Sequence, residues 1–520
     1  MKKYRIAKVA PLLLVFSIGS AACAGNPNDP EADVNEVEIC VMDAGYRTEA
    51  FYALEEAFEK KYPEINVQIK PVTQINDKLT NELTRSSSTV DLWFAGEQNV
   101  ISLVEKSRDC PFEDLTEMLN ETADGESVKL IDKMDEQLKY YNTYTDADGK
   151  VHFYSVSWVY GACGLMYNAD YVPDDQVPKT TNQLIALFDK ILNKQLDGCS
   201  TKPLIWSGSS GSSYMAYAME TWKAQYMGVD SYNAMVNFYD GTEYTYSYLA
   251  DDGVLHAYEV VKALAKDEYF VEGSKGFQHT PAQQDFLRGE GVFMPNGDWI
   301  ETEMKKAMEE SGTSITAKVK TLQMPVVSAL GKKLYLAGPS ASDAAHEEML
   351  INLITAIDEG KTNGEIKESW NILTDEKIDA VREARSVVYS LGVSHRIYLP
   401  SSSNAKTASK KFIKFFASDE GTLIFRKYAG SSTPFKMTVM PEDEERSFFM
   451  QSQDKILKGC KIIYNGITKS YIRAYNDVKS DSSAFVQFVE EPSLTAKTLL
   501  NNYYSDVAGK WSAMKLIAGV

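Results

Sequence analysis

Side chains that commonly hold metals or form nucleophile–base pairs are scarce and scattered in this sequence. Five histidines occur among 520 residues, and none has the spacing of an HExxH motif or of a Cys/His zinc site. The GxSxG elbow, the Walker phosphate loop and the GxGxxG fingerprint are absent as well. We therefore expect no bound metal, no cofactor and no catalytic residue.

Cysteine is also sparse, and its spacing includes no CxxC pair. Isolated cysteines of this kind are most often small buried residues, and the sequence leaves open whether one disulfide forms. The six cysteines are Cys23, Cys40, Cys110, Cys163, Cys199 and Cys460.

Positive charge is in short supply: 54 lysines and arginines face 73 acidic residues, which gives a net charge of −19. Nucleic acids are bound through basic surfaces, so this balance excludes a nucleic-acid partner. Beyond the N-terminal segment, no apolar run is long enough to cross a bilayer. Hydrophobic residues make up 44% of the chain, which is typical of a globular protein, and its length predicts two domains.

The N-terminal segment has the organisation of an export signal. The basic start MKKYR precedes a short apolar run from Ala10 to Ile18, and small residues from Ser20 to Ala22 precede Cys23. This pattern resembles a bacterial lipoprotein signal, although Ser20 stands where such signals usually have leucine. The resemblance implies cleavage after residue 22, diacylation of Cys23 and anchoring on the extracytoplasmic face of the cell membrane. Ordinary secretory cleavage at the same site is the alternative, and residues 23–36 read as a flexible tether.

Alternating strand and helix patterns begin at residue 37. Phe51, Leu54 and Phe58 recur at helical spacing, and Pro63 ends that helix. Such alternation predicts an α/β fold with a doubly wound, mostly parallel sheet. The expected elements are strands at 37–42, 65–69 and 90–95 and helices at 49–62 and 74–85.

The stretch 281–304, PAQQDFLRGEGVFMPNGDWIETEM, gives the most specific local prediction. It predicts a short helix, a buried strand at 292–294, a tight turn at 295–297 and a second helix. Asp298 has the position of an N-cap, with Glu301 three residues on as in a capping box. Trp299 is then expected on the first turn of a helix at a strand end, where open α/β sheets bind ligands.

This stretch resembles a signature of the family 1 extracellular solute-binding proteins of ABC transporters, the maltose-binding-protein-like group. AFEKKYPEINVQI, VDLWFAGEQ, residues 150–194, KTASKKFIKFFASDE and YAGSSTPF are similar to further segments of that family. The resemblance implies an α/β, two-lobe, periplasmic-binding-protein-like fold of type II. Each lobe is then a mostly parallel sheet flanked by helices, and the ligand cleft lies between the lobes. We expect lobe 1 at 37–155 and 328–428, with a helical insertion at about 340–395, and lobe 2 at 156–327 and 429–520.

Sugar recognition needs aromatic rings for the C–H faces of the ligand and polar groups for its hydroxyls. The chain has 7 tryptophans and 30 tyrosines. We select those near expected strand ends and lobe crossings, and we assign Trp93 and Trp222 to packing. The candidate ligand-binding residues are Tyr46, Arg47, Glu97, Gln98, Trp158, Tyr160, Trp206, Tyr214, Asp298 and Trp299.

The resemblance implies a non-catalytic, lipid-anchored carrier that closes its lobes around a carbohydrate and delivers it to an ABC permease. We expect it to act as a monomer. Two other functions remain open. One is a secreted glycan-degrading enzyme, because any two of the 73 acidic residues could meet in the fold. The other is a binding protein of the same fold for a peptide, a polyamine or a metal chelate.

Overall fold

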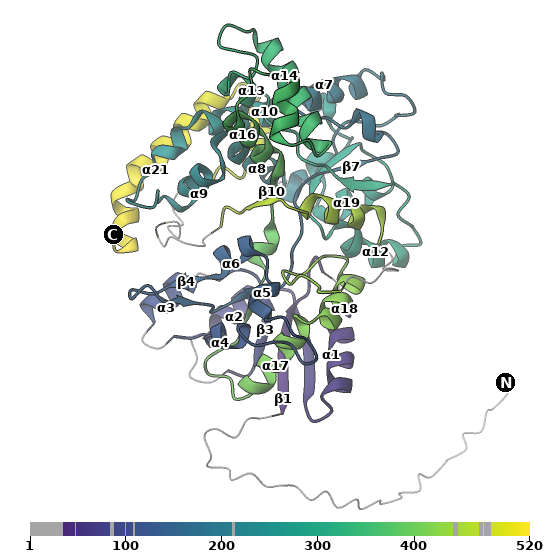
Figure 1. Cartoon of the computed structure of the whole chain (residues 1–520). Coiled ribbons are helices and arrows are strands. Elements are labelled where there is room, and N and C mark those ends of the chain that lie inside the picture. The colour runs from purple at the N-terminus through teal and green to yellow at the C-terminus, as the bar shows by residue number, and fades with distance from the viewer. Residues whose placement is uncertain are drawn as a thin grey trace, which may run out of the picture.

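The computed structural model describes residues 35–46, 48–83, 88–98, 100–107, 110–210, 214–439, 446–466, 472 and 480–520. The chain forms two stacked units (Figure 1). The lower unit holds the N-terminal strands together with α17 (Lys406–Phe416) and α18 (Asp419–Ala429), and the upper unit holds most of the remaining helices. One apolar cluster runs through both units. The predicted export signal, Cys23 and most of the tether lie outside the described residues.

The lower unit is built on a five-stranded sheet in the order β2-β1-β3-β11-β6. β1, β2 and β3 are parallel, whereas β11 runs antiparallel to both β3 and β6. The first three strands confirm the predicted ones to within a few residues. The strands are β1 (Glu36–Met42), β2 (Asn66–Val72), β3 (Leu92–Ala95), β6 (Val156–Ser157) and β11 (Arg396–Tyr398).

Helix α1 (Glu49–Lys61) covers this sheet with the apolar face that its sequence predicts. Phe51, Leu54 and Phe58 are buried, and the Phe51 ring meets the ring of Phe94 edge-on at 5.0 Å. The other lower-unit elements are α2 (Ile75–Leu83), α3 (Val100–Lys106), α4 (Thr116–Leu119), α5 (Leu130–Lys133), α6 (Glu136–Asn142) and the hairpin of β4 (Tyr144–Thr145) and β5 (Val151–His152).

The upper unit contains a three-stranded sheet of β8 (Phe293–Asn296), β7 (Gly164–Asn168) and β9 (Val319–Thr321). β7 is central and antiparallel to both neighbours. The prediction of a mostly parallel sheet in each lobe is therefore wrong for this unit. The strand–helix alternation that supported it lies in residues 37–95, whereas here β7 enters from the crossing and both partners run back beside it.

Helix α8 (Met215–Met227) forms the centre of the upper unit and is buried on nearly all sides. It contacts α10, β7 and β10. The upper unit also holds α7 (Thr181–Leu192), α9 (Val229–Asn237), α10 (Asp252–Leu264), α11 (His279–Leu287), α12 (Ile300–Glu310), α19 (Phe448–Leu457), α20 (Ala484–Glu490) and α21 (Ala496–Ala518).

The expected insertion is helical, but it belongs to the upper unit. It contains α13 (Ala329–Lys333), α14 (Asp343–Asp358), α15 (Asn363–Ser369) and α16 (Asp375–Ser386). α13 and α16 contact α14 and also α8, so the apolar faces of this segment are buried against the upper unit. The assignment of residues 328–395 to lobe 1 is therefore wrong, and the chain rejoins the lower sheet only at β11.

Several chain segments cross from one unit to the other, and they run side by side near residues 158–163, 389–395 and 432. Beside them, β10 (Val387–Tyr389) pairs in parallel with β12 (Lys461–Ile463). Backbone hydrogen bonds join these crossing segments into one unit, here called the strap. These bonds run from Trp158 N–H to the His395 carbonyl (3.0 Å), from Tyr160 N–H to the Ser432 carbonyl (2.8 Å) and from Cys163 N–H to the Tyr389 carbonyl (2.8 Å).

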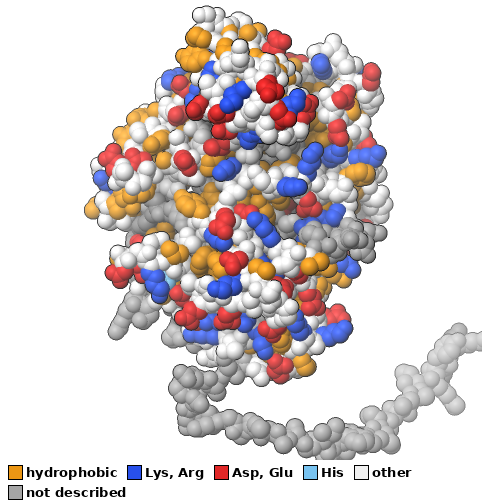
Figure 2. Space-filling model, viewed as in Figure 1, with side chains coloured by type: hydrophobic (Ala, Val, Ile, Leu, Met, Phe, Trp, Pro, Cys, Tyr) orange, Lys and Arg blue, Asp and Glu red, His pale blue; other side chains and the backbone are white. Residues whose placement is uncertain are grey.

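Three further features concern the surface charge, the apolar helices and the cysteines. On the face in Figure 2, acidic and basic side chains are interspersed, without a continuous basic stripe. Within the described ranges, no helix combines the length and the apolar character needed to cross a bilayer. The five described cysteines, all except Cys23, are free thiols, and three of them are buried.

Candidate functional site

The ends of β1 and β6 bring together the first members of an aromatic cluster where the units meet. The ring of Tyr46 lies edge-on to Trp158 at 5.3 Å and to His395 at 5.4 Å. Trp158 is fully buried, and its indole N–H donates to the Ala95 carbonyl at 3.1 Å. Two of the predicted ligand-binding residues, Tyr46 and Trp158, thus form part of the junction between the units.

The turn after β8 adds Asp298 from the upper unit. Tyr46 donates its hydroxyl to both carboxylate oxygens of Asp298 at 3.1 and 3.2 Å, and Ser431 donates a short bond from beside the strap. Gly161 allows this approach, because a Cβ there would lie 2.0 Å from the carboxylate carbon. The N-cap role predicted for Asp298 is wrong: α12 begins after Trp299 and has no side-chain cap, since the carboxylate turns toward the lower unit.

Burial sets the electrostatics of this contact. Asp298 is 1% exposed, and desolvation raises its pKa to about 6, although the bonds from Ser431 and Tyr46 oppose the rise. Burial lowers the pKa of His395 to about 4, so this imidazole is neutral near pH 7. Burial also raises the pKa of the Cys163 thiol well above its usual value. Asp298 is thus a titratable acid among neutral groups.

Trp299 contacts rings from both units. Its centroid lies 6.5 Å from that of Tyr46, 5.8 Å from that of Tyr214 and 6.4 Å from that of Tyr217. Tyr214 has a left-handed backbone at the start of α8 and stacks on His279 at 4.6 Å. We call Tyr46, Trp158, Tyr214, Tyr217, Asp298 and Trp299 the junction cluster.

Glu303 makes a second acidic contact across the junction. The backbone N–H of Gly45 in the lower unit and the side chain of Gln283 on α11 lie near its carboxylate and favour the charged form. Burial raises the pKa of Glu303 as it does that of Asp298. Two carboxylates of the upper unit therefore meet the loop that follows β1.

Buried polar atoms without a hydrogen-bond partner gather beside the junction cluster. These atoms lie on the segments 206–210 and 274–277 and on α11, and the two segments touch, because the Ser209 N–H donates to the Phe277 carbonyl at 3.1 Å. Buried polar atoms in folded proteins are nearly always paired, so a local group of unpaired ones marks a surface suited to a polar ligand. The atoms are Trp206 Nε1, Ser207 Oγ, Ser210 Oγ, Ser274 Oγ, His279 Nδ1 and Gln283 Oε1, here called the polar rim.

Comparison with known proteins identifies the family. Residues 53–445 match the model described as bacterial extracellular solute-binding protein, which is more than half of the chain. This chain belongs to the bacterial extracellular solute-binding proteins. The family places it outside the cytoplasm, and its relatives are binding proteins.

Individual relatives of this solute-binding protein are distant. The diacetylchitobiose binding protein NgcE of Streptomyces coelicolor is 24% identical over 289 residues, which span 55% of this chain and 56% of that protein. Apo RafE from Streptococcus pneumoniae has a TM-score of 0.57 at 14% identity, covering 93% of this chain and 99% of RafE. Maltose-bound MalE3 of T. maritima has a TM-score of 0.58 at 14% identity, covering 91% and 99%. These structures confirm the two-lobe fold.

The remaining residues predicted to bind ligand in this solute-binding protein make contacts outside the junction cluster. Glu97 accepts a hydrogen bond from Tyr464 at 2.6 Å, and Gln98 accepts one from Thr80 at 3.0 Å. Tyr160 contacts the thiol of Cys460 at 3.2 Å. The Trp206 ring packs between Phe270 and Phe485, although its N–H belongs to the polar rim. Arg47 lies outside the described residues.

Several members of the site were missed in the sequence. Tyr217, Tyr389 and His279 sit in helices or a short strand, and Tyr464 follows β12, all without a recognisable motif. Ser431 lies within the segment YAGSSTPF, which was noted only as a likeness. Tyrosine abundance was the available signal, and it does not tell which rings meet.

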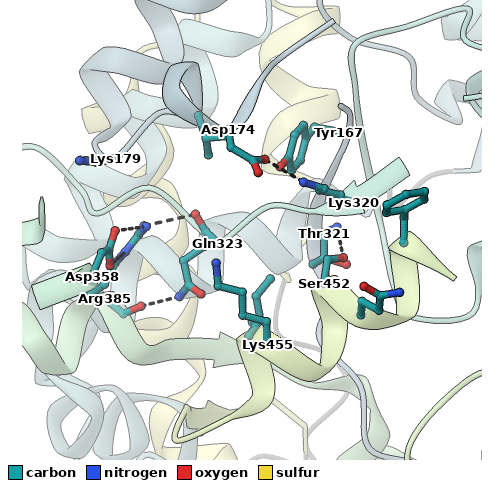
Figure 3. A pocket seen from close by; sticks show the side chains of 14 residues that line it. Tyr167, Asp174, Lys179, Lys320, Thr321, Gln323, Asp358, Arg385, Ser452 and Lys455 are labelled. Carbon is teal, nitrogen blue, oxygen red and sulfur yellow. Dashed lines mark hydrogen bonds and ion pairs between the residues drawn. The ribbon is translucent and has the colours of Figure 1, made fainter. Parts of the chain in front are cut away.

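The hollow in Figure 3 lies apart from the junction cluster, where α19 rests against β9. Its volume is about 480 Å³. Many polar side chains that line the hollow already bond to one another. We therefore interpret it as a structural contact between α19 and the upper unit and not as a ligand site. The pairs are Lys320 with Asp174 (2.7 Å), Arg385 with Asp358 (3.0 and 2.9 Å), Gln323 with the Arg385 carbonyl (2.7 Å) and Thr321 N–H with Ser452 (2.9 Å).

Proposed function

We propose that this solute-binding protein captures a carbohydrate between its two units and delivers it to the permease of an ABC importer, without catalysing a reaction. The observation that carries the proposal is the polar rim beside the rings of the junction cluster. Aromatic rings suit the C–H faces of a sugar, and unpaired hydroxyl, indole, imidazole and amide groups suit its hydroxyls. The names of its relatives, which include diacetylchitobiose, raffinose and maltose binding, point the same way.

Closure of the two units is the proposed binding motion. The crossings form one hydrogen-bonded strap, so the units can rotate about it while each keeps its own sheet. Tyr46 would then separate from Asp298 and Trp299 in the open form and meet them in the closed form. A permease can distinguish these two forms. The site residues selected from the sequence remain proposals for ligand contact.

The first prediction concerns binding itself. The purified chain should be stabilised by at least one saccharide in a panel containing diacetylchitobiose, maltose and raffinose. A ligand at about 100 times its dissociation constant adds roughly 2.7 kcal/mol to the free energy of unfolding. Thermal melting identifies the saccharide, and calorimetry gives its affinity. Stabilisation by a peptide, polyamine or metal chelate alone would overturn the proposal, as would product release from a saccharide incubated with a pure preparation.

The second prediction concerns anchoring at Cys23. We propose that the mature chain begins at this cysteine and carries two acyl chains, because one chain binds membranes only marginally. The Cys23→Ser variant should move from the membrane fraction to the soluble fraction and bind saccharide with unchanged affinity. Mass spectrometry of the wild-type N-terminus provides the control. An unmodified N-terminus on a protein that is already soluble would disprove the anchor.

A further inference from the structure

A second hollow spans the two units away from the polar rim. It has a volume of about 590 Å³ and lies between α6 of the lower unit and α9 of the upper unit, with β12 completing it. Gln137 fixes α6 to β12, since its amide bonds the Cys460 carbonyl and the Ile462 N–H, each at 2.6 Å. Because its two walls belong to different units, this outer groove changes shape whenever the units rotate.

Two tyrosine rings are open to solvent in the outer groove. Tyr140 on α6 is 44% exposed, and Tyr239, just after α9, is 40% exposed. The hydroxyl of Tyr239 donates to the Gly241 carbonyl at 3.0 Å, and its ring lies against Tyr244 at 5.1 Å. The Tyr239 ring is therefore held in place while one face stays available. Exposed, fixed rings suit an amphipathic ligand.

The polar groups of the groove are amides and carboxylates. Asn233 has a buried side-chain oxygen without a hydrogen-bond partner. Asp230, on the opposite wall from Tyr140, lies close enough to help raise the pKa of that phenol, although burial is the larger cause. Asp230 and Asp240 outnumber the single lysine, Lys461, so the lining disfavours an anion. A neutral, hydroxyl-rich ligand fits this combination of rings, amides and acids.

A continuous row of rings leads from the outer groove to the junction cluster. Its members come from α6, the segment after β12, β10, α8 and the turn after β8. Both binding surfaces therefore lie along one junction between the units. The centroid distances are 5.1 Å for Tyr140–Tyr141, 6.5 Å for Tyr141–Tyr464, 6.1 Å for Tyr464–Tyr389, 5.0 Å for Tyr389–Tyr217 and 6.4 Å for Tyr217–Trp299.

From these observations we propose that the outer groove is a second saccharide-binding subsite. It takes the distal units of an extended oligosaccharide whose other end lies at the junction cluster. This inference rests on the proposed function and specifies its ligand as an oligosaccharide rather than a single sugar. A ligand that touches both walls of the groove also favours the closed arrangement, because it contacts both units at once.

The test compares a short and a long saccharide on the same variants. Diacetylchitobiose and maltose serve as short probes, and longer chito- and malto-oligosaccharides serve as long ones. Tyr140→Ala and Tyr239→Ala should each weaken binding of the long probe by about 5- to 30-fold, as expected for a truncated aromatic anchor. Affinity for the short probe should stay at the wild-type value. Calorimetric titration measures both.

The matched control is Tyr52→Ala, because Tyr52 is a tyrosine of similar exposure, 45%, on α1 outside the groove. It should leave both affinities unchanged. Equal affinities of the Tyr140 and Tyr239 variants and wild type for the long probe would overturn the subsite, as would an equal loss for both probes. A wild-type protein that binds short saccharides but gains nothing from length also overturns it and leaves the proposed function intact. Failure of every saccharide to bind wild type would overturn both.

Discussion

Replacing Trp299 with alanine is expected to weaken saccharide binding by about 30-fold or more while the protein remains folded. Truncation of a central aromatic anchor commonly costs about 2 kcal/mol of binding free energy or more, which is a factor of about 30. The ring of Trp299 meets Tyr46 of the lower unit and two tyrosines of the upper unit, Tyr214 and Tyr217. It therefore lies where a ligand would be enclosed when the two units close. Calorimetric titration of the variant with the saccharide found in the panel measures the loss.

Trp222→Ala is the matched control for Trp299. Trp222 is fully buried in α8, and its indole donates to the Pro325 carbonyl at 3.2 Å. Removing such a core ring typically costs about 3–5 kcal/mol of folding free energy. This variant should therefore melt well below wild type, yet its folded fraction should bind saccharide normally. If Trp299→Ala behaves in the same way, with a much lower melting temperature and intact affinity, Trp299 is a packing residue.

The sequence predicted the local geometry around Trp299 better than its contacts. Gly289 and Gly291 follow the end of α11 and Gly297 follows β8, because such breakers act locally. The tight turn expected at 295–297 is wrong, since Pro295 and Asn296 belong to β8 and pair with β7. The role of Asp298 could not be read locally. Its hydrogen-bond donors are Tyr46, 252 positions away, and Ser431, 133 positions away, and they replace the backbone N–H groups that an N-cap would use.

The lower sheet could be predicted because its first strands alternate with amphipathic helices along one continuous stretch. The destination of residues 328–395 could not, because an amphipathic helix has the same pattern whichever unit it covers. Leu350, Leu353 and Ile354 on α14 mark an apolar face, and only the fold reveals that this face is buried in the upper unit. The row of tyrosines between the two binding surfaces is hidden for a similar reason, since its members are far apart in the chain.

Asp298 should make the stability of the protein depend on pH between about 4 and 6. Its ordinary pKa of 3.8 rises to about 6 in the folded protein, so the folded state holds a proton that the unfolded state has released across this range. The free energy of unfolding therefore falls as the pH rises from about 4 to about 6, by up to about 3 kcal/mol, and this contribution changes little above pH 6. Tyr46, Tyr217 and Cys163 beside it have raised pKa values and stay neutral throughout.

Other titratable groups at the junction also make the stability depend on pH, so the wild-type profile must be compared with that of a variant that lacks only the Asp298 carboxylate. His395 becomes charged only near pH 4, and the pKa of Glu303 is raised by burial in the same direction as that of Asp298. Subtracting the profile of Asp298→Asn from that of wild type removes both contributions. The variant should equal or approach wild type near pH 4 and exceed it in stability at pH 7, because the buried carboxylate is replaced by a neutral amide.

Asp419→Asn supplies a control of opposite sign, because bonds from Lys133 and Thr438 lower the pKa of Asp419 to about 2 in the folded protein, although its partial burial opposes this. It should be less stable than wild type by a nearly constant amount from pH 5 to 7. Denaturant unfolding of the three proteins across this range and down to pH 4 decides the matter. Parallel profiles for wild type and Asp298→Asn would mean that folding leaves the pKa of Asp298 at its ordinary value of 3.8. In that case its bonds to Tyr46 and Ser431 would join the two units as bonds to an ionised carboxylate from pH 5 to 7.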